Sequence, residues 1–486
     1  MKRQTIAIAI LALILPALLR GLWYYRGIPE RSEIATPDYA SFERPEPSIS
    51  TPDTDDIEQM EGAVVLDGYH ANQFTLNEIE ALTSALRARG GNIETAADSL
   101  TLEFLLKTAS AFVSVSPSAT FTPYETQVLK NFAERGGKIL VFTDATRNML
   151  YFDFITGNPI AYGDANAANS LLKYFDISVN NDYLYNTEKN EGNFRNVIFD
   201  DFGKNELTFG LDEVAFYGAR SIKTDSGTLL LRGSETNLSS LDDAHDPNAG
   251  GAALSADGSV AAFGDFTFLS APYSAYTDNA TLIQNIADFA LSGSQTPSLD
   301  LFPFIFTSSA AQVFVSPELE KDPSMIAALG GLQSALRFLD VDLEFVDEAP
   351  SSGNAILIGT FDAAEDFEDY LLKADVEIGS EGISTAAFGD VNGPGNGVVI
   401  FESGSKGSTL VLLASSPDDV IALIGVISYG NLSACLTSER AAVCSVGSGD
   451  DYYDDYYYED TSGETFEETP AETPDGSTEA TPTPGG

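Results

Sequence analysis

A pattern of buried strand, capped helix and glycine pair occurs twice near the start of the folded part of the chain. The first copy of its helix spans Phe74–Gly91 and the second spans Phe121–Gly137. In each copy a Thr is followed three residues later by a Glu, which is a capping box, and a Gly-Gly pair ends the helix. Strands that alternate with such helices predict a doubly wound, mostly parallel α/β sheet with right-handed crossovers.

Uninterrupted apolar runs supply the strands of this sheet. They lie at Ala63–Leu66, Ala111–Val115, Ile139–Thr143 and Ser259–Phe263. Runs of this kind are typical of strands that are buried on both faces. A last helix follows the fourth run, and we expect Asp278 to cap it, because Asp is a favoured residue before the first turn.

The rest of the chain divides by composition into further segments. Residues 150–255 are rich in Asn, Gly and Tyr, and we interpret them as an extension that packs over one edge of the sheet. A second set of strands and helices after residue 300 predicts a smaller α/β domain. The predicted organisation is an anchor at 1–26, an extended linker at 27–62, the first domain at 63–293, the second at 301–446 and a disordered acidic tail at 447–486.

The N-terminus predicts a single-pass membrane helix. Lys2 and Arg3 precede an apolar run that ends near the aromatic cluster Trp23-Tyr24-Tyr25, and no small-residue cleavage site follows. We therefore interpret this segment as an uncleaved signal anchor. The positive charges on both sides leave the orientation open, and the Thr/Pro-rich tail and the cysteine pair favour a location outside the cell membrane for the bulk of the chain.

Charge and cysteine content narrow the possible partners. The chain has 486 residues and a formal net charge of −48, which excludes a basic surface for nucleic acid. No glycine-rich phosphate loop follows any strand, so we expect no nucleotide and no cofactor. Cys435 and Cys444 are the two cysteines, and their short spacing favours a disulfide in an exported protein over two unpaired thiols.

Polar residues follow the predicted strands at the edge where open α/β sheets bind their ligands. The candidate ligand-binding residues are Asp67, His70, Asn72, Ser116, Asp144 and Asp265. Ser116 with His70 is the one nucleophile–base pair that this edge offers. The carboxylates and His70 could hold a metal ion, although their spacing does not match a metal motif, and the competing interpretation is that they only stabilise loops.

Several segments of the first domain resemble a known family, the class I glutamine-amidotransferase-like domains that have lost amidotransferase activity. The matching motifs are Leu66–Asn72, Phe121–Glu125, Arg135–Leu140, Gly264–Phe268 and Asp278-Asn279. The resemblance covers about half the chain. It implies a membrane-anchored prokaryotic protein of unknown function, related to auxiliary subunits of gliding-motility ABC transporters and to an intraflagellar-transport subunit.

This chain departs from true glutamine amidotransferases at the position of the nucleophile. An amidotransferase needs a Cys nucleophile on a strained turn after a strand, whereas here Val115 leads into Ser116-Pro117-Ser118. The sequence therefore predicts a non-catalytic, extracytoplasmic binding or scaffold protein, with a transporter subunit as the partner that the resemblance implies. The alternative is an extracytoplasmic hydrolase that uses Ser116, or a metal near Asp67 and His70.

Overall fold

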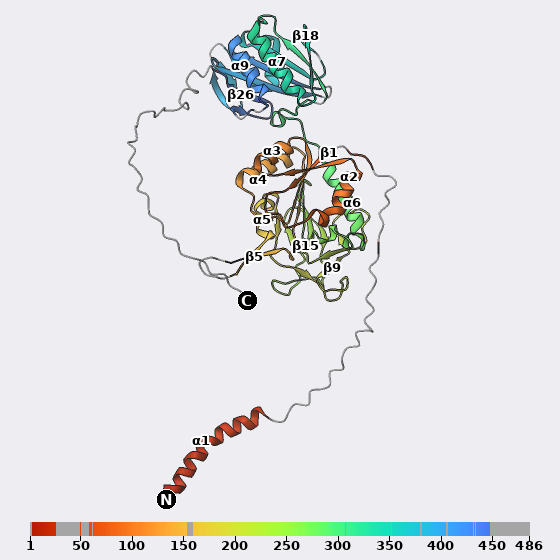
Figure 1. Cartoon of the computed structure of the whole chain (residues 1–486), viewed down its shortest axis with the longest axis vertical. Coiled ribbons are helices and arrows are strands. Elements are labelled where there is room, and N and C mark those ends of the chain that lie inside the picture. Colours follow the sequence, from red (N-terminus) through yellow and green to blue (C-terminus); the bar gives the residue numbers. More distant parts are fainter. Residues whose placement is uncertain are drawn as a thin grey trace, which may run out of the picture.

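The computed structural model of the chain describes residues 2–25, 49, 58–60, 62–152, 159–306, 308–350, 352–379, 382–404, 407–430, 432 and 434–447. Nearly all of the predicted linker and tail lies outside these residues. Helix α1 (Lys2–Tyr24) has no buried side chain and stands apart from the rest of the chain in Figure 1. It is long and apolar enough to cross a membrane, a test of length and composition that a signal sequence also passes.

A ten-stranded sheet forms the centre of the first domain, and the predicted parallel arrangement is confirmed. Its main path runs β10-β13-β15-β16-β4-β3-β1-β2, with β12 on β15 and β7 on β12. The parallel strands are β2 (Gly91–Ala96), β1 (Gly62–Asp67), β3 (Ala109–Val115), β4 (Lys138–Phe142) and β16 (Val260–Phe263).

Helices cover both faces of this sheet, as the doubly wound prediction requires (Figure 1). Helices α2 (Glu80–Ala88) and α6 (Asn279–Leu291) contribute to one buried cluster. The opposite cluster contains side chains of α3 (Ser99–Leu106), α4 (Pro123–Glu134) and α5 (Asp164–Leu172). The strands between them are therefore dry on both sides, which explains their uninterrupted apolar runs.

The capping boxes form at both predicted helix starts. The Glu125 carboxylate accepts a hydrogen bond from the Thr122 backbone N–H at 2.7 Å, and Glu78 does the same for Thr75 at 2.8 Å. The Thr75 box opens a 3-10 turn, η2 (Leu76–Ile79), that leads into α2. Asp278 occupies the N-cap position of the last helix, as predicted, but its carboxylate makes no cap bond and instead accepts from the backbone N–H groups of Asp212 and Glu213.

The middle region adds antiparallel strands to one side of the sheet. β15 (Ala249–Leu254) pairs with β16, and β13 (Thr228–Arg232) and β10 (Asp201–Phe202) extend beyond it. β7 (Ile177–Val179) and β12 (Ile222–Thr224) complete the sheet. Two-stranded ribbons lie outside it: β9 (Asn196–Phe199) with β11 (Val214–Tyr217), β8 (Leu184–Tyr185) with β14 (Leu238–Ser239), and β5 (Asn148–Phe152) with β6 (Pro159–Gly163).

The second domain is built on a seven-stranded sheet of order β18-β17-β19-β24-β23-β26-β25. Its first four strands are parallel: β18 (Asp342–Val346), β17 (Ala310–Val315), β19 (Ala355–Thr360) and β24 (Gly407–Ala414). The antiparallel strands are β23 (Asn396–Gly404), β26 (Ala441–Ser445) and β25 (Cys435–Thr437). Cys435 and Cys444 are directly opposite one another on β25 and β26 and are joined by a disulfide bond.

Helices α7 (Pro323–Arg337) and α9 (Pro417–Ser428) pack on one face of this sheet. The other face is covered by η8 (Phe361–Phe367), α8 (Glu368–Lys373) and a small sheet of β20 (Val376–Gly379), β21 (Gly382–Thr385) and β22 (Gly389–Asn392). The buried clusters of the first domain end at Leu291, and those of the second begin at Leu299.

Candidate functional site

The six sequence-predicted site residues all lie at the carboxyl edge of the parallel sheet, but they belong to different hydrogen-bond networks. Asp67 ends β1, Ser116 follows β3, and Asp144 and Asp265 follow β4 and β16. All four of these side chains are fully buried, and His70 is 3% exposed. Because β3 separates β1 from β4, the carboxylates at the two ends of this edge do not meet.

The first network surrounds Asp67. Its Oδ1 lies 2.8 Å from His70 Nδ1, and its Oδ2 accepts hydrogen bonds from Ser114 Oγ at 2.7 Å and Asn72 Nδ2 at 3.2 Å. The other ring nitrogen of His70, Nε2, lies 3.5 Å from Glu125 Oε2. Every polar atom of the His70 ring therefore faces a carboxylate from inside the fold.

Aromatic rings enclose the same histidine. The His70 ring centroid is 3.9 Å from that of Phe121 and 4.2 Å from that of Tyr69. Burial acts to lower the pKa of His70, but the hydrogen bond and charge of Asp67, together with the charge of Glu125, raise that pKa above its usual value overall. The two carboxylates thus favour the protonated form of His70, which links the end of β1 to α4.

The second network surrounds Ser116, whose backbone has a φ of +43°. Its hydroxyl donates to Asp164 Oδ2 at 2.8 Å, and the backbone N–H of Asp144 donates to the same oxygen at 2.7 Å. Arg220 Nε donates to Asp164 Oδ1 at 2.7 Å. Arg220 and Asp164 are 1% and 0% exposed, so this is a fully buried ion pair.

Sequence reasoning missed both members of that pair. Asp164 opens α5, and Arg220 lies between β11 and β12 in the segment Gly218–Ser221. The signal that could have found Arg220 is a single basic residue between two apolar strands. Burial raises the pKa of Asp164 despite the opposing effect of the Arg220 charge and of the Ser116 hydrogen bond.

The third network joins Asp144 to Asp265 through Thr267. Asp144 Oδ2 accepts from Thr267 Oγ1 at 2.8 Å, and Asp144 Oδ1 accepts from the backbone N–H of Thr146 at 2.7 Å. Asp265 Oδ2 accepts from the backbone N–H of Tyr217 at 2.9 Å, and its Oδ1 accepts from that of Thr267 at 2.9 Å. Burial, followed by the charge of Asp144, raises the pKa of Asp265 well above its usual value.

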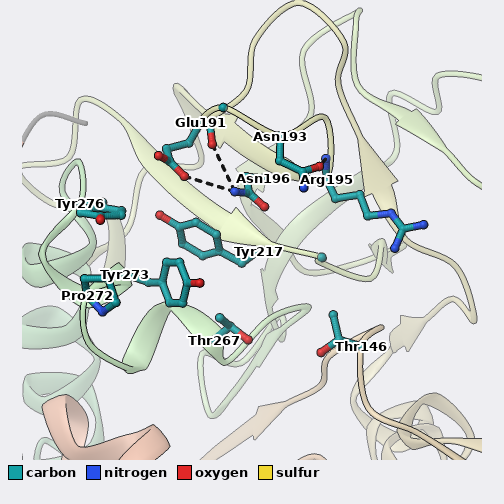
Figure 2. Close-up of a pocket in the computed structure, with 12 residues that line it drawn as sticks. Thr146, Glu191, Asn193, Arg195, Asn196, Tyr217, Thr267, Pro272, Tyr273 and Tyr276 are labelled. Carbon is teal, nitrogen blue, oxygen red and sulfur yellow. Dashed lines mark hydrogen bonds between the residues drawn. The ribbon is translucent and has the colours of Figure 1, made fainter. Parts of the chain in front are cut away.

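A pocket of about 680 Å³ adjoins the third network, and Figure 2 shows the residues that line it. Thr146, Tyr217 and Thr267, which bond to Asp144 or Asp265, line its floor. The remaining lining residues come from the loop before β9, from the turn after β11 and from the segment before α6: Glu191, Gly192, Asn193, Arg195, Asn196, Gly218, Pro272, Tyr273 and Tyr276.

The hydroxyl of Tyr217 is the unusual atom of this pocket. Tyr217 is 6% exposed, and its hydroxyl has no hydrogen-bond partner among the described residues. Burial, then the charges of Glu191 and Asp265, raises the pKa of this phenol, so it stays protonated and able to donate. An unsatisfied buried donor costs about 1–3 kcal/mol, and a bound ligand could satisfy it.

The predicted metal alternative finds no set of ligands in the structure. Within the described residues, no group of three or more His, Cys, Asp or Glu side chains is placed to hold a metal ion. The Asp67 and His70 pair bonds to Ser114, Asn72 and Glu125. On this side of the edge, the buried Oδ1 of Asn72 has no hydrogen-bond partner among the described residues.

No protein-family model and no curated protein matches this chain. Three solved structures that are similar to it are the mmIFT52 N-terminal domain and ThuA-like proteins from Bacteroides uniformis and Parabacteroides merdae. They are 19%, 11% and 8% identical, with TM-scores of 0.38, 0.31 and 0.27. The matches cover 48%, 48% and 49% of this chain and 99%, 91% and 92% of the respective structures. A similarity at this level does not assign the chain to a family.

Proposed function

We propose that this chain is a membrane-anchored, extracytoplasmic binding protein without catalytic activity, built on an inactive amidotransferase-like domain. The pocket over Asp144 and Asp265 is its ligand site. The observation that carries this proposal is a contrast at one sheet edge: the nucleophile and base candidates are closed off, whereas a pocket with an unsatisfied phenol is open to a ligand.

Specific contacts keep the Ser116 hydroxyl from acting as a nucleophile. Ser116 is fully buried, its hydroxyl donates to a carboxylate, and its backbone N–H donates to the Phe142 carbonyl. A nucleophilic Ser needs a His base within hydrogen-bond reach and free N–H donors for the oxyanion. Here the hydroxyl points to Asp164, which an arginine already neutralises.

One observation favours the alternative of a hydrolase. The positive φ of Ser116, directly after β3, is the kind of strained backbone that presents a nucleophile in other enzymes. The buried ion pair beneath it offers a simpler reason for the strain, since that turn brings the hydroxyl onto Asp164.

The cellular setting in this proposal rests on two features. The apolar α1 is suited to anchor the chain, and a disulfide between Cys435 and Cys444 is typical of proteins that fold outside the reducing cytosol. A transporter subunit in the same membrane is the partner class that the family resemblance implies. Protease protection of the chain in intact spheroplasts, or a mature N-terminus that begins after Arg26, would contradict this arrangement.

The function is tested with the full-length chain in detergent. We expect no turnover of ester, amide or glycoside substrates, and no difference between wild type and Ser116→Ala. Saturable binding of a small molecule, lost in pocket variants, supports the proposal. Hydrolysis that disappears in Ser116→Ala, while its thermal unfolding stays cooperative, would establish the hydrolase instead.

A further inference from the structure

The pocket over Asp144 and Asp265 is lined by three tyrosines and by one side chain that bears a carboxylate, Glu191. Tyr217, Tyr273 and Tyr276 come from β11 and from the segment before α6, and Figure 2 shows Glu191 above their rings. We propose that this pocket binds an organic cation, a substituted ammonium group with a neighbouring hydrogen-bonding group. This inference rests on the proposed function, in which the same pocket is the ligand site.

The geometry of the rings suits a cation with a bulky, weakly hydrated head. The centroids of Tyr217 and Tyr273 are 4.3 Å apart with planes inclined by 44°, and those of Tyr273 and Tyr276 are 6.1 Å apart at 88°. Tyr217 and Tyr273 pack against one another, Tyr276 meets Tyr273 edge to face, and all three rings line the pocket. A cation within about 6 Å of an aromatic face is attracted by the negative face of the ring.

The charges around the pocket favour a cation over an anion. Among the described residues, no lysine, arginine or histidine forms a salt bridge with Glu191. Its carboxylate accepts a hydrogen bond from neutral Asn196, at 3.2 Å, which holds it over the pocket. The charge of Asp144 lies beneath the floor and adds negative potential.

Arg195 lines the same pocket but turns its charge elsewhere. Its guanidinium lies 4.4 Å from the ring centroid of Tyr183 and 5.6 Å from that of Phe194. Figure 2 shows the side chain extending away from the three tyrosines. The positive charge of the rim is therefore directed outward, and the tyrosine side keeps the carboxylate of Glu191.

The unpartnered hydroxyl of Tyr217 defines the second part of the ligand. A quaternary ammonium cannot accept a hydrogen bond, so the phenol requires an acceptor next to the cationic head, such as a hydroxyl or carbonyl oxygen. A volume of about 680 Å³ is in the range of small-molecule sites, and it accommodates a cation with a short polar arm.

Choline is the probe, and 3,3-dimethyl-1-butanol is its neutral isostere of the same shape. With the full-length chain in detergent, isothermal titration calorimetry should show choline binding, with the neutral isostere at least about tenfold weaker. We expect Glu191→Gln and Tyr217→Phe each to weaken choline binding about tenfold, and Tyr276→Ala more. Tyr429→Phe, an exposed tyrosine of the second domain, is the matched control.

Arg195→Ala separates the classes of ligand. Removal of this charge should raise choline affinity, whereas an anionic ligand would lose affinity. Two results would contradict a cationic ligand and leave the binding function intact. One is equal affinity for choline and its neutral isostere. The other is the absence of choline binding while a neutral sugar binds and Tyr217→Phe weakens that binding. Absence of binding by any probe, together with Ser116-dependent hydrolysis, would overturn both.

Discussion

The two ends of the carboxyl edge of the first sheet carry similar polar residues, but one end is closed by internal contacts and the other borders a pocket. At β1, the carboxylate of Asp67 makes hydrogen bonds with His70, Ser114 and Asn72, and aromatic rings cover the histidine. At β4 and β16, Asp144 and Asp265 are equally buried, yet the side chains bonded to them form the floor of a pocket. Polar residues after buried strands thus form internal hydrogen bonds at one end, whereas at the other they hold the residues that line a pocket.

The difference lies in what covers each end. The loop after β1 folds back, so that the His70 carbonyl accepts from the backbone N–H groups of Ser118 and Ala119. Over β4 and β16, the cover comes from the antiparallel extension and from the segment before α6, which leave a space between them. The extension of residues 150–255 and the segment before α6 therefore make most of the pocket wall, and the loops after β4 and β16 support it.

The largest expected effect is at the ion pair between these two ends. Arg220→Met should lower the free energy of unfolding by about 3–5 kcal/mol, because it leaves the buried Asp164 without its counter-charge. Denaturant unfolding of the full chain measures this loss. Arg232→Met is the control, since its pair with Asp201 is exposed and is worth at most about 1 kcal/mol. Equal losses in both variants would show that the buried pair has no special role.

Ser116 tests whether the turn after β3 is structural. Ser116→Ala should cost about 1.5–3 kcal/mol of stability through loss of a hydrogen bond to a carboxylate. Ser116→Gly loses the same bond but relieves the positive φ, so we expect it to be about 1 kcal/mol more stable than the Ala variant. Chemical denaturation at neutral pH compares the two. A Gly variant that is less stable than the Ala variant would contradict a strained backbone.

His70, at the β1 end of the sheet edge, should make the free energy of unfolding depend on pH. Its folded pKa is raised, so its stabilisation is fully present below the unfolded value of about 6.5 and is lost as the pH rises through the folded pKa. The slope is at most about 1.4 kcal/mol per pH unit for one proton. Unfolding measured from about pH 5.5 to about pH 8.5 should lose this pH-dependent component in His70→Gln. If His245→Gln removed the slope and His70→Gln did not, the assignment would be wrong.

The smallest effect is expected at the open end. Asn196→Ala removes the hydrogen bond that holds Glu191 over the pocket, and it should weaken choline binding about threefold with almost no change in stability. Titration calorimetry and thermal unfolding of the same preparation measure the two quantities. A loss of stability comparable to that of Ser116→Ala would mean that the pocket loop is part of the core.

The sequence predicted the elements that local rules determine. The Thr122 and Thr75 boxes, the glycine pairs and the apolar runs mark most parallel strands and their helices. β2 was missed because it is an edge strand with exposed polar side chains, and α5 because Ala and Asn give it no clear apolar stripe. The pocket could not be predicted, since Glu191, Tyr217 and Tyr273 are brought together by pairing of β9 with β11 and by packing before α6, at sequence separations that no motif spans.

The connection to the second domain is bound to the opposite edge of the sheet from the pocket. Thr296 donates its backbone N–H to the carbonyl of Arg135, shortly before β4, at 2.7 Å. Gln295 Nε2 donates to the carbonyls of Leu106, at the end of α3, and of Ala109, at the start of β3. Lys107 Nζ then donates to the carbonyl of Phe302 at 2.6 Å. The second domain is consequently tethered away from the pocket and contributes none of its lining residues, so a solute can enter the pocket without displacing that domain.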